Sequence, residues 1–483
     1  MAYDSAAVFY FTHLFHFGSK EPVSLYPTAF GISYGWASPS TLLLTSDDSP
    51  LPSGKINIDE ASWVVSLACL GGLVGNIIFG FATSTFGRKK PLIFLAIPSI
   101  ISWLLIWFAQ NVYYLYVARF LNGMTGGGMY ILIPLFLIEI ADDRVRGTLG
   151  SLVILTTNLG LLLSFILGEF CDYNTTPKVT IVLIIIYAIL FSIFPESPSA
   201  LMKQNKITEA EKSIRFYQRI PESDKDESLQ FEMNKLRTTF GSDKNEENSF
   251  NWSDLTMNPG RRAFIMGVGL AILYEFCGVI AMLNYSAIIF QETGSSMSPN
   301  MSAIVIGSIQ LVGSIVTTNL VDRAGRKVIN PDLAHPYAKV CFHQQVLYIV
   351  STTGTAFGQI ILASYMMLKS MGYNVEAYNF VPITCFSLVL FLAAWGILTL
   401  PFLVIAETMP ENLKDLLTSF CVALIWALEF ALIKFLPFLN EILGFHGSLF
   451  LFAGICLIGT VLIILFVPET KGKSYEEIMK MLQ

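Results

Sequence analysis

The chain has 483 residues, of which 53% are hydrophobic and 14% charged, and its formal net charge is −6. Soluble domains carry about 25% charged residues, so this composition excludes an ordinary soluble domain and indicates a protein that lies in lipid. The small net charge, with cations confined to short loops, also excludes nucleic acid as a partner.

Residues 1–22 have neither a basic start nor a small-residue cleavage site, so we interpret them as a cytoplasmic N-terminal segment and not as a signal peptide. Six apolar stretches follow, most of them near the roughly 20 residues that a helix needs to cross about 30 Å of hydrocarbon. Together, residues 23–194 predict an N-terminal six-helix bundle. Its spans are expected at residues 23–44, 61–82, 91–109, 113–140, 148–167 and 179–194.

The second span carries four glycines, Gly71, Gly72, Gly75 and Gly80. Small residues let the backbones of two membrane helices approach closely. We therefore expect this span to pack tightly against a neighbour.

Residues 195–262 are hydrophilic and form a cytoplasmic connecting segment between two bundles. Residues 263–467 predict a second six-helix bundle, and a polar cytoplasmic tail follows at 468–483. Its spans are expected at residues 263–290, 301–321, 346–368, 381–405, 416–439 and 447–467. The polar stretch 329–345 interrupts this half, and we interpret it as an inserted cytoplasmic loop.

A short polar hinge occurs once in each half, directly after an apolar run. It reads GFATSTFGRKK at residues 80–90 and NLVDRAGRK at residues 319–327. In both copies a glycine allows a tight reversal, and the cations hold the loop at the membrane surface. The repetition indicates that the two bundles are duplicated and pseudo-symmetric.

Basic residues set the orientation. The loops on the side of the connecting segment carry Arg88, Lys89, Lys90, Arg144, Arg146, Arg323, Arg326, Lys327, Lys414, Lys471 and Lys473. The opposite loops offer little beyond Lys55, Lys178 and Lys369. The positive-inside rule then puts both termini in the cytoplasm, and two N-glycosylation sequons, at Asn174 and Asn300, fall outside.

Carboxylates and cations recur at the cytoplasmic ends of the spans in both halves, and we interpret them as a gate. Its members are Arg88, Lys89, Glu139 and Arg146 in the first half, and Asp322, Arg326, Lys327, Glu407 and Lys414 in the second. Ion pairs that form only while this face is closed would act as a breakable latch. The alternative is that each is an ordinary helix-end charge reaching the interface; recurrence in both halves favours the latch.

Five motifs follow one another in order at the span ends. They are Arg119-Phe-Leu-Asn-Gly, Glu139 through Arg146-Gly-Thr-Leu-Gly, Pro195-Glu-Ser-Pro, Asp322-Arg-Ala-Gly-Arg-Lys and Pro468-Glu-Thr-Lys-Gly-Lys-Ser. With them the chain resembles the sugar porters of the major facilitator superfamily, and is most similar to the insect trehalose transporter branch. The resemblance implies twelve helices in two six-helix bundles, a central site and alternating access without ATP.

The positions that bind sugar in this family differ more than the scaffold motifs do. In the seventh span, Tyr274-Glu-Phe-Cys-Gly stands in place of paired glutamines, and Ile280 in place of an asparagine. The other departures are Ser84 for aspartate, Ser199 for arginine, Ile154 for glutamine, Thr399 for proline and Phe402 for tryptophan.

A sugar site needs amides or carboxylates for the hydroxyl groups and an aromatic face for the CH surface. The polar candidates at membrane depth are Asn158, Tyr274, Asn284 and Gln310, and the aromatic ones are Trp395, Phe402 and Trp426. For Asn158 and Gln310 the alternative is a hydrogen bond between helices. For the aromatic residues the alternative is packing.

Glu275 is an ionisable residue inside an apolar span. Such a carboxylate costs about 3 kcal/mol on insertion scales and marks a pathway or a paired charge. Our hypothesis is that Glu275 faces the cavity, where it accepts sugar hydroxyls or carries a proton. Glu429 and Lys434 in the eleventh span are interpreted as an internal ion pair.

No motif indicates an enzyme, a cofactor or a metal site, because the chain has no phosphate loop, nucleophile with a base, or metal cluster. We expect a multi-pass plasma-membrane protein that moves a hexose or a disaccharide such as trehalose by facilitated diffusion. A monomer is compatible with the sequence. The alternatives are transport of another small polar solute, a proton-coupled porter working through Glu275, and a sugar sensor that does not transport.

Overall fold

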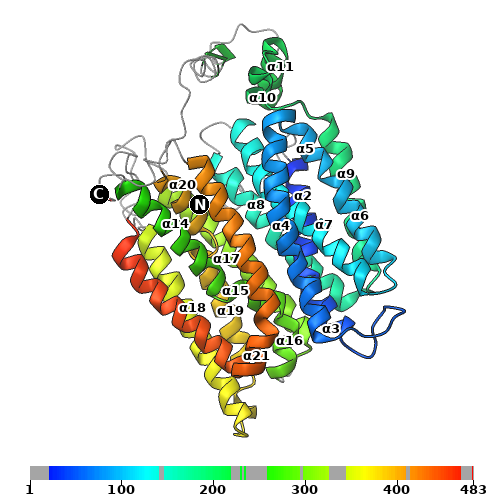
Figure 1. The fold of residues 1–483 in the computed structure, drawn as a ribbon, viewed down its shortest axis with the longest axis vertical. Coiled ribbons are helices and arrows are strands. Elements are labelled where there is room, and N and C mark those ends of the chain that lie inside the picture. The colour runs from blue at the N-terminus through cyan, green and yellow to red at the C-terminus, as the bar shows by residue number, and fades with distance from the viewer. Residues whose placement is uncertain are drawn as a thin grey trace, which may run out of the picture.

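The structure is a computed structural model that describes residues 21–140, 146–218, 258–293, 297–325, 344–409 and 414–468, together with 229–230, 233–234, 236 and 481. Two groups of long helices lie next to each other (Figure 1). The first group runs from blue to green-cyan along the chain, and the second from green to red. The architecture is therefore two helical bundles joined by a connecting segment.

The N-terminal bundle contains the helices of the first six expected spans. They are α2 (Glu21–Gly35), α3 (Ala37–Leu44), α4 (Ile58–Phe86), α5 (Lys89–Phe94), α6 (Ala96–Trp107), α7 (Val112–Ile140), α8 (Arg146–Phe170) and α9 (Thr175–Ile193). The most extensive contacts in this bundle join α4 to α7 and α2 to α8, and α6 packs on α7 and α9.

The C-terminal bundle contains the helices of the other six. They are α14 (Asn258–Phe276), α15 (Val279–Asn284), α16 (Ser286–Thr293), α17 (Pro299–Gly325), α18 (Gln344–Ser370), the 3-10 turn η3 (Glu376–Tyr378), α19 (Val381–Trp395), α20 (Leu400–Thr408) and α21 (Lys414–Phe466). Here α18 packs on α21 and α19, and α17 packs on α19.

Ten helical stretches among the described residues are long and apolar enough to cross a membrane. The first expected span is missing from these ten because it is divided into α2 and α3, which are both too short to count alone. One of the ten, Leu417–Phe466, has 50 residues and contains two spans. Gly444 breaks it with φ 70° and ψ 163°, and the red half of α21 runs back toward the end of the molecule at which the orange half began (Figure 1). The twelve predicted spans are accounted for in this way.

The contact between α4 and α7 is close because glycines bring the two backbones together. A Cβ atom on Gly71 would lie 2.0 Å from the Phe120 carbonyl oxygen, and one on Gly123 would lie 1.7 Å from that of Ala68. Neither distance can be tolerated, so these positions require glycine. The expected tight packing of the second span is confirmed.

The connecting segment begins with two short helices, α10 (Pro198–Lys203) and α11 (Ile207–Gln218). We call the end of the molecule at which they lie the connector end, and the opposite end, at which α4 begins, the far end (Figure 1). The Tyr217 hydroxyl on α11 donates to the Pro195 carbonyl at 2.8 Å and fixes this helix to the end of α9. Burial raises the pKa of Tyr217.

The two bundles touch through α8 with α17, α4 with α21, and α3 with α16. At the far end the Ser38 and Ser286 hydroxyls lie 2.8 Å apart, and Lys434 Nζ of α21 lies 2.5 Å from Asp59 Oδ1 of α4. The expected ion pair between Glu429 and Lys434 is therefore wrong. The α4–α21 contact places an acidic residue of the other bundle within reach of Lys434.

Several expectations fall partly or wholly on residues outside the described ranges. They concern the N-terminal segment 1–22, the central part of the connecting segment 195–262, the inserted loop 329–345 and the tail 468–483. Only the end of the expected inserted loop is described, and it is helical, because α18 begins at Gln344.

Candidate functional site

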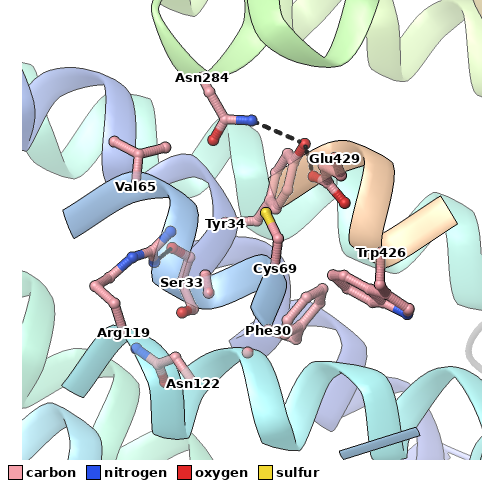
Figure 2. A pocket seen from close by; sticks show the side chains of 12 residues that line it. Phe30, Ser33, Tyr34, Val65, Cys69, Arg119, Asn122, Asn284, Trp426 and Glu429 are labelled. Atoms are coloured by element: carbon pink, nitrogen blue, oxygen red, sulfur yellow. Dashed lines mark hydrogen bonds between the residues drawn. The ribbon is translucent and has the colours of Figure 1, made fainter. Parts of the chain in front are cut away.

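The two bundles enclose a small cavity near the middle of their spans (Figure 2). Its walls come from both halves of the chain, and the space left for the centres of water molecules is about 10 Å³. This is room for about one water, so a sugar ring does not fit in this arrangement. The lining residues that carry polar side chains are Ser33, Tyr34, Cys69, Arg119, Asn122, Asn284, Trp426 and Glu429.

A chain of three side chains crosses this cavity. Asn284 Nδ2 of α15 donates to the Tyr34 hydroxyl of α2 at 3.1 Å. The same hydroxyl donates to Glu429 Oε1 of α21 over a longer distance of 3.5 Å. The two dashed lines in Figure 2 meet at the Tyr34 oxygen. Tyr34 thus links the N-terminal bundle to two helices of the C-terminal bundle.

Arg119 on α7 is a buried cation in the wall of the cavity, with 2% of its surface exposed. Its guanidinium donates to the carbonyl oxygens of Ser33 at 2.7 Å and Val64 at 3.2 Å, and it lies over the ring of Trp36. These bonds tie α7 to α2 and α4. Asn122, one turn further along α7, lines the same cavity.

The seventh span is interrupted next to Glu275. Gly278 has φ 75°, a left-handed conformation that favours glycine, and it separates α14 from α15. Irregular backbone at membrane depth needs internal hydrogen-bond partners, and Gln359 Nε2 donates to the freed Cys277 carbonyl at 2.7 Å. This break turns α15 so that Asn284 reaches the cavity.

Glu275 itself is fully buried, and neither carboxylate oxygen has a hydrogen-bond partner among the residues that the structure describes. It does not line the cavity of Figure 2. Its neighbour Tyr274 is half-buried and packs edge-on against Phe402. That Glu275 faces the substrate remains a hypothesis.

A second polar cluster joins the bundles between α8 and α17. Asn158 Nδ2 donates to Ser314 Oγ at 2.6 Å, and Gln310 Nε2 donates to Asn158 Oδ1 at 3.3 Å. The Gln310 Oε1 atom has no partner within the described part of the chain. The predicted residues Asn158 and Gln310 are thus brought together. Their contact is also a hydrogen bond between helices of the two bundles, which was the alternative interpretation.

The predicted aromatic residues separate into two groups. Trp426 lines the cavity and lies against Gly72 of α4, where a Cβ atom would come within 2.5 Å of its ring. Trp395 packs on Phe391, and Phe402 is 38% exposed on α20. Of the eight predicted site residues, only Asn284 and Trp426 line the cavity.

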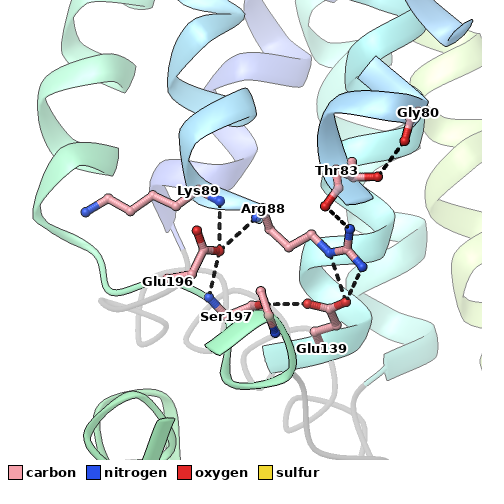
Figure 3. Close-up of polar contacts among 8 residues, drawn as sticks. Gly80, Thr83, Arg88, Lys89, Glu139, Glu196 and Ser197 are labelled. Atoms are coloured by element: carbon pink, nitrogen blue, oxygen red, sulfur yellow. Dashed lines mark hydrogen bonds and ion pairs between the residues drawn. The ribbon is translucent and has the colours of Figure 1, made fainter. Parts of the chain in front are cut away.

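The described part of the predicted gate lies at the connector end of the N-terminal bundle (Figure 3). Arg88 Nε and Nη2 contact Glu139 Oε1 at 3.0 and 2.9 Å, and the Ser197 hydroxyl donates to Glu139 Oε2. Glu196 Oε1 accepts from the backbone N–H groups of Arg88 and Lys89, both at 2.9 Å. This network joins the hinge to α7 and to the connecting segment.

The other gate residues lie where the structure describes no side chains: Arg146, Asp322, Arg326, Lys327, Glu407 and Lys414. A contact between the two halves of the gate therefore stays a prediction.

The two predicted glycosylation sites differ in exposure. Asn174 is exposed just before α9. Asn300 is half-buried in the first turn of α17, and Ser302, the third residue of its sequon, is fully buried. Modification at either position remains a prediction, and the geometry favours Asn174.

Tyr34, Arg119 and Glu429 are among the lining residues that were not expected as site residues. An arginine within an apolar span is costly and marks a functional position by default, so Arg119 and its motif carried a usable signal. Glu429 carried the same signal but was assigned to Lys434. Nothing in the sequence around Tyr34 distinguishes it from the other tyrosines.

The fold and the cavity define a class of protein. Two bundles of membrane-spanning helices that enclose a polar site between them are the architecture of a membrane transporter. The model of the sugar (and other) transporter family matches residues 22–482. The chain belongs to this family, and it is a transporter and not an enzyme.

Relatives with curated names are similar over most of the chain. The facilitated trehalose transporter Tret1 of Bombyx mori is 30% identical over 451 residues, which are 93% of this chain and 83% of that protein. Tret1 of Drosophila mojavensis is 28% identical over 456 residues, which are 94% of this chain and 50% of that protein. The chain thus spans about half the length of some of these relatives.

Solved structures confirm the fold. The inward-open conformation of the xylose transporter XylE from E. coli matches with a TM-score of 0.75 at 18% identity, covering 97% of this chain and all of that one. The POT family transporter PepTSo matches with a TM-score of 0.61 at 13% identity, covering 96% and 98%. The fold is that of the major facilitator superfamily.

Proposed function

We propose that this protein carries a hexose or a disaccharide such as trehalose across the plasma membrane by facilitated diffusion and alternating access. The main support is the cavity, whose polar groups come from both bundles: Tyr34 and Arg119 from one, Asn284 and Glu429 from the other. A site shared in this way opens to one compartment or the other when the bundles rock. The similarity to trehalose transporters supports the choice of sugar.

In this proposal the connector end is cytoplasmic and the far end is extracellular. Arg88 and Lys89 at the connector end support this orientation by the positive-inside rule. The contacts of Lys434 with Asp59 and of Ser38 with Ser286 would then close the outer face. Rocking must break these contacts, and we expect the two halves of the cytoplasmic gate to meet when it does.

The test is tracer uptake into vesicles that contain the purified protein, with trehalose, glucose and fructose supplied in turn. Saturable uptake of one of them, inhibited by an excess of the same unlabelled sugar, is the expected result. Empty vesicles and the Arg119→Ala variant serve as controls. If the protein is folded and inserted but no sugar enters faster than it enters empty vesicles, the proposal that this chain transports sugar is wrong.

A second candidate is proton-coupled transport of a sugar or of another small polar solute. It is favoured by Glu275, a fully buried carboxyl group with no partner among the described residues. Such a group can bind a proton, or it can accept a hydrogen bond from the solute. An inward-directed proton gradient should then drive accumulation above equilibrium, and Glu275→Gln should abolish the accumulation. Uptake that only equilibrates, with or without a gradient, supports the facilitator.

A further inference from the structure

The Tyr34 hydroxyl makes the same pair of hydrogen bonds that a hydroxyl of a bound sugar would make. It accepts from the Asn284 amide at 3.1 Å and is oriented to donate to the Glu429 carboxylate at 3.5 Å. A hydroxyl group carries one donor and two acceptor lone pairs, so both roles are available to one oxygen. Asn284 and Glu429 are 3% and 6% exposed, and besides the Tyr34 hydroxyl the Asn284 amide donates to the Ile280 carbonyl of its own helix at 3.1 Å.

This arrangement belongs to a narrow cavity. The space that remains is enough for about one water, and the ring of Tyr34 reaches from α2 toward α15 and α21 (Figure 2). A sugar can contact Asn284 and Glu429 only if Tyr34 withdraws. Tyr34 and a sugar hydroxyl are therefore alternatives at the same two polar groups.

We propose that Tyr34 is a positioning residue that takes the place of a substrate hydroxyl, so that the two bundles can close over a site that holds no sugar. The inference rests on the proposed function, and it concerns a step that every facilitator must make. After release of its sugar, the carrier has to return through a closed state. Without Tyr34, closing would leave Asn284 Nδ2 with only the Ile280 carbonyl of its own helix, at 3.1 Å, and would take one donor from the buried Glu429 carboxylate, and both losses are costly.

The consequence is a division between two kinds of transport. Exchange of sugar for sugar uses only the loaded carrier, whereas net uptake also needs the return of the carrier without sugar. Tyr34→Phe keeps the ring but removes the hydroxyl. It should slow net uptake by about fivefold or more relative to exchange, the size expected for one hydrogen bond. The sugar concentration that gives half-maximal exchange should also fall, because the sugar no longer has to displace the Tyr34 hydroxyl from Asn284 and Glu429.

The first experiment measures exchange and net uptake of radiolabelled trehalose, and in parallel of glucose, in vesicles with wild-type protein and Tyr34→Phe. The matched control is Tyr187→Phe, which removes a buried hydroxyl that donates to the Leu92 carbonyl within one bundle. An unchanged ratio of exchange to net uptake in Tyr34→Phe, equal to that in Tyr187→Phe, would overturn the proposal. A reduction of both rates by the same factor would also overturn it.

The second experiment needs no sugar. Spin labels are placed at Lys55 and Tyr373, which lie on exposed far-end loops of the two bundles, after Cys171 and Cys341 are replaced by serine. A short distance between the two labels reports a closed far end. In Tyr34→Phe the fraction of molecules with a short distance should fall relative to wild type and to Tyr187→Phe. Identical distance distributions in all three proteins would contradict the proposal.

The two readouts separate the failure of this inference from failure of the proposed function. If the wild-type protein moves neither sugar, the sugar proposal fails, and the distance measurement still decides the role of Tyr34. If Tyr34→Phe does not fold, Asn284→Leu removes the donor to the same hydroxyl and is used in the distance measurement. Asn284→Leu should also reduce the fraction of molecules with a short distance between the labels. If that fraction is unchanged, the contact of Tyr34 with Asn284 does not hold the bundles closed.

Discussion

Lys434 on α21 and Asp59 on α4 form an ion pair between the two bundles, with 2.5 Å between Nζ and Oδ1. Lys434 also donates to Ser62 Oγ at 2.9 Å and lies 4.4 Å from the centre of the Trp63 ring. The lysine side chain is 12% exposed and the aspartate 76%. Since the carboxylate is in contact with solvent, the pair itself contributes no more than about 1 kcal/mol.

The first prediction concerns this pair. Asp59→Asn should leave the fold intact and open the far end more often, because an inter-bundle attraction is lost. The readout is the alkylation rate of a cysteine introduced at Ser38, which is 2% exposed in the closed far end; it should rise a few-fold, in line with about 1 kcal/mol. Asp47→Asn breaks an ion pair with Lys55 inside one loop and is the control. Equal rates in both variants would exclude a role for the pair in closing.

The second prediction tests the contact between α4 and α7. Gly123→Ala places a methyl group against the backbone of Ala68, which cannot move aside, so the variant should lose about 1–3 kcal/mol of stability or fail to fold. Gly269 has no atom within 4 Å of a Cβ position. Gly269→Ala should therefore be neutral or stabilise the helix by about 0.5–1 kcal/mol. Thermal unfolding in detergent compares the two; similar melting temperatures would contradict the packing described here.

The third prediction separates a buried polar group kept for function from one kept for structure. Glu275→Met removes a carboxyl group without a described partner, so the protein should become more stable while transport falls by an order of magnitude. Gln359→Met is the matched change, because the Gln359 amide bonds the Cys277 carbonyl. It should lower stability by about 1–3 kcal/mol. If both variants shift the melting temperature in the same direction, this distinction does not hold.

The fourth prediction concerns the docking of the connecting segment. The Ser197 hydroxyl donates to Glu139 and accepts from the Ala200 N–H group as the N-cap of α10. Ser197→Ala should cost about 1 kcal/mol and speed hydrogen exchange in α10, with α7 unaffected. Ser192→Ala removes an exposed hydroxyl that only bonds a carbonyl of its own helix, and should change nothing. Unaltered exchange in α10 of Ser197→Ala would show that the hydroxyl does not hold this helix.

The architecture was predictable because apolar length and glycine spacing act locally along the chain. The span at residues 113–140 and helix α7 (Val112–Ile140) nearly coincide, since a run of that length in lipid must be helical. The division between α2 and α3, and the break at Gly278, were not predicted. Hydropathy does not reveal where a helix is interrupted, because the interruption depends on contacts with neighbouring helices. Here Gln359 donates to the Cys277 carbonyl.

The site was less predictable because its partners are distant in sequence. Tyr34 and Glu429 are 395 residues apart, and Asn284 and Tyr34 are 250 apart. Whether Glu429 meets Lys434 or Tyr34 depends on how α21 is rotated against α4 and α2, which no local pattern contains. Asn284 was found because an amide at membrane depth is unusual by itself.

The reversal at Gly444 has a consequence for biosynthesis. The two limbs of α21 meet at Gly444 without a separate loop between them. The Ser448 hydroxyl donates to Asn440 Oδ1 at 2.6 Å and stabilises the turn. A hairpin of this kind is suited to enter the bilayer as one unit during synthesis. An epitope or protease site inserted between residues 443 and 447 should therefore reduce the yield of full-length protein in the membrane, whereas the longer loop at residues 46–57 should accept it.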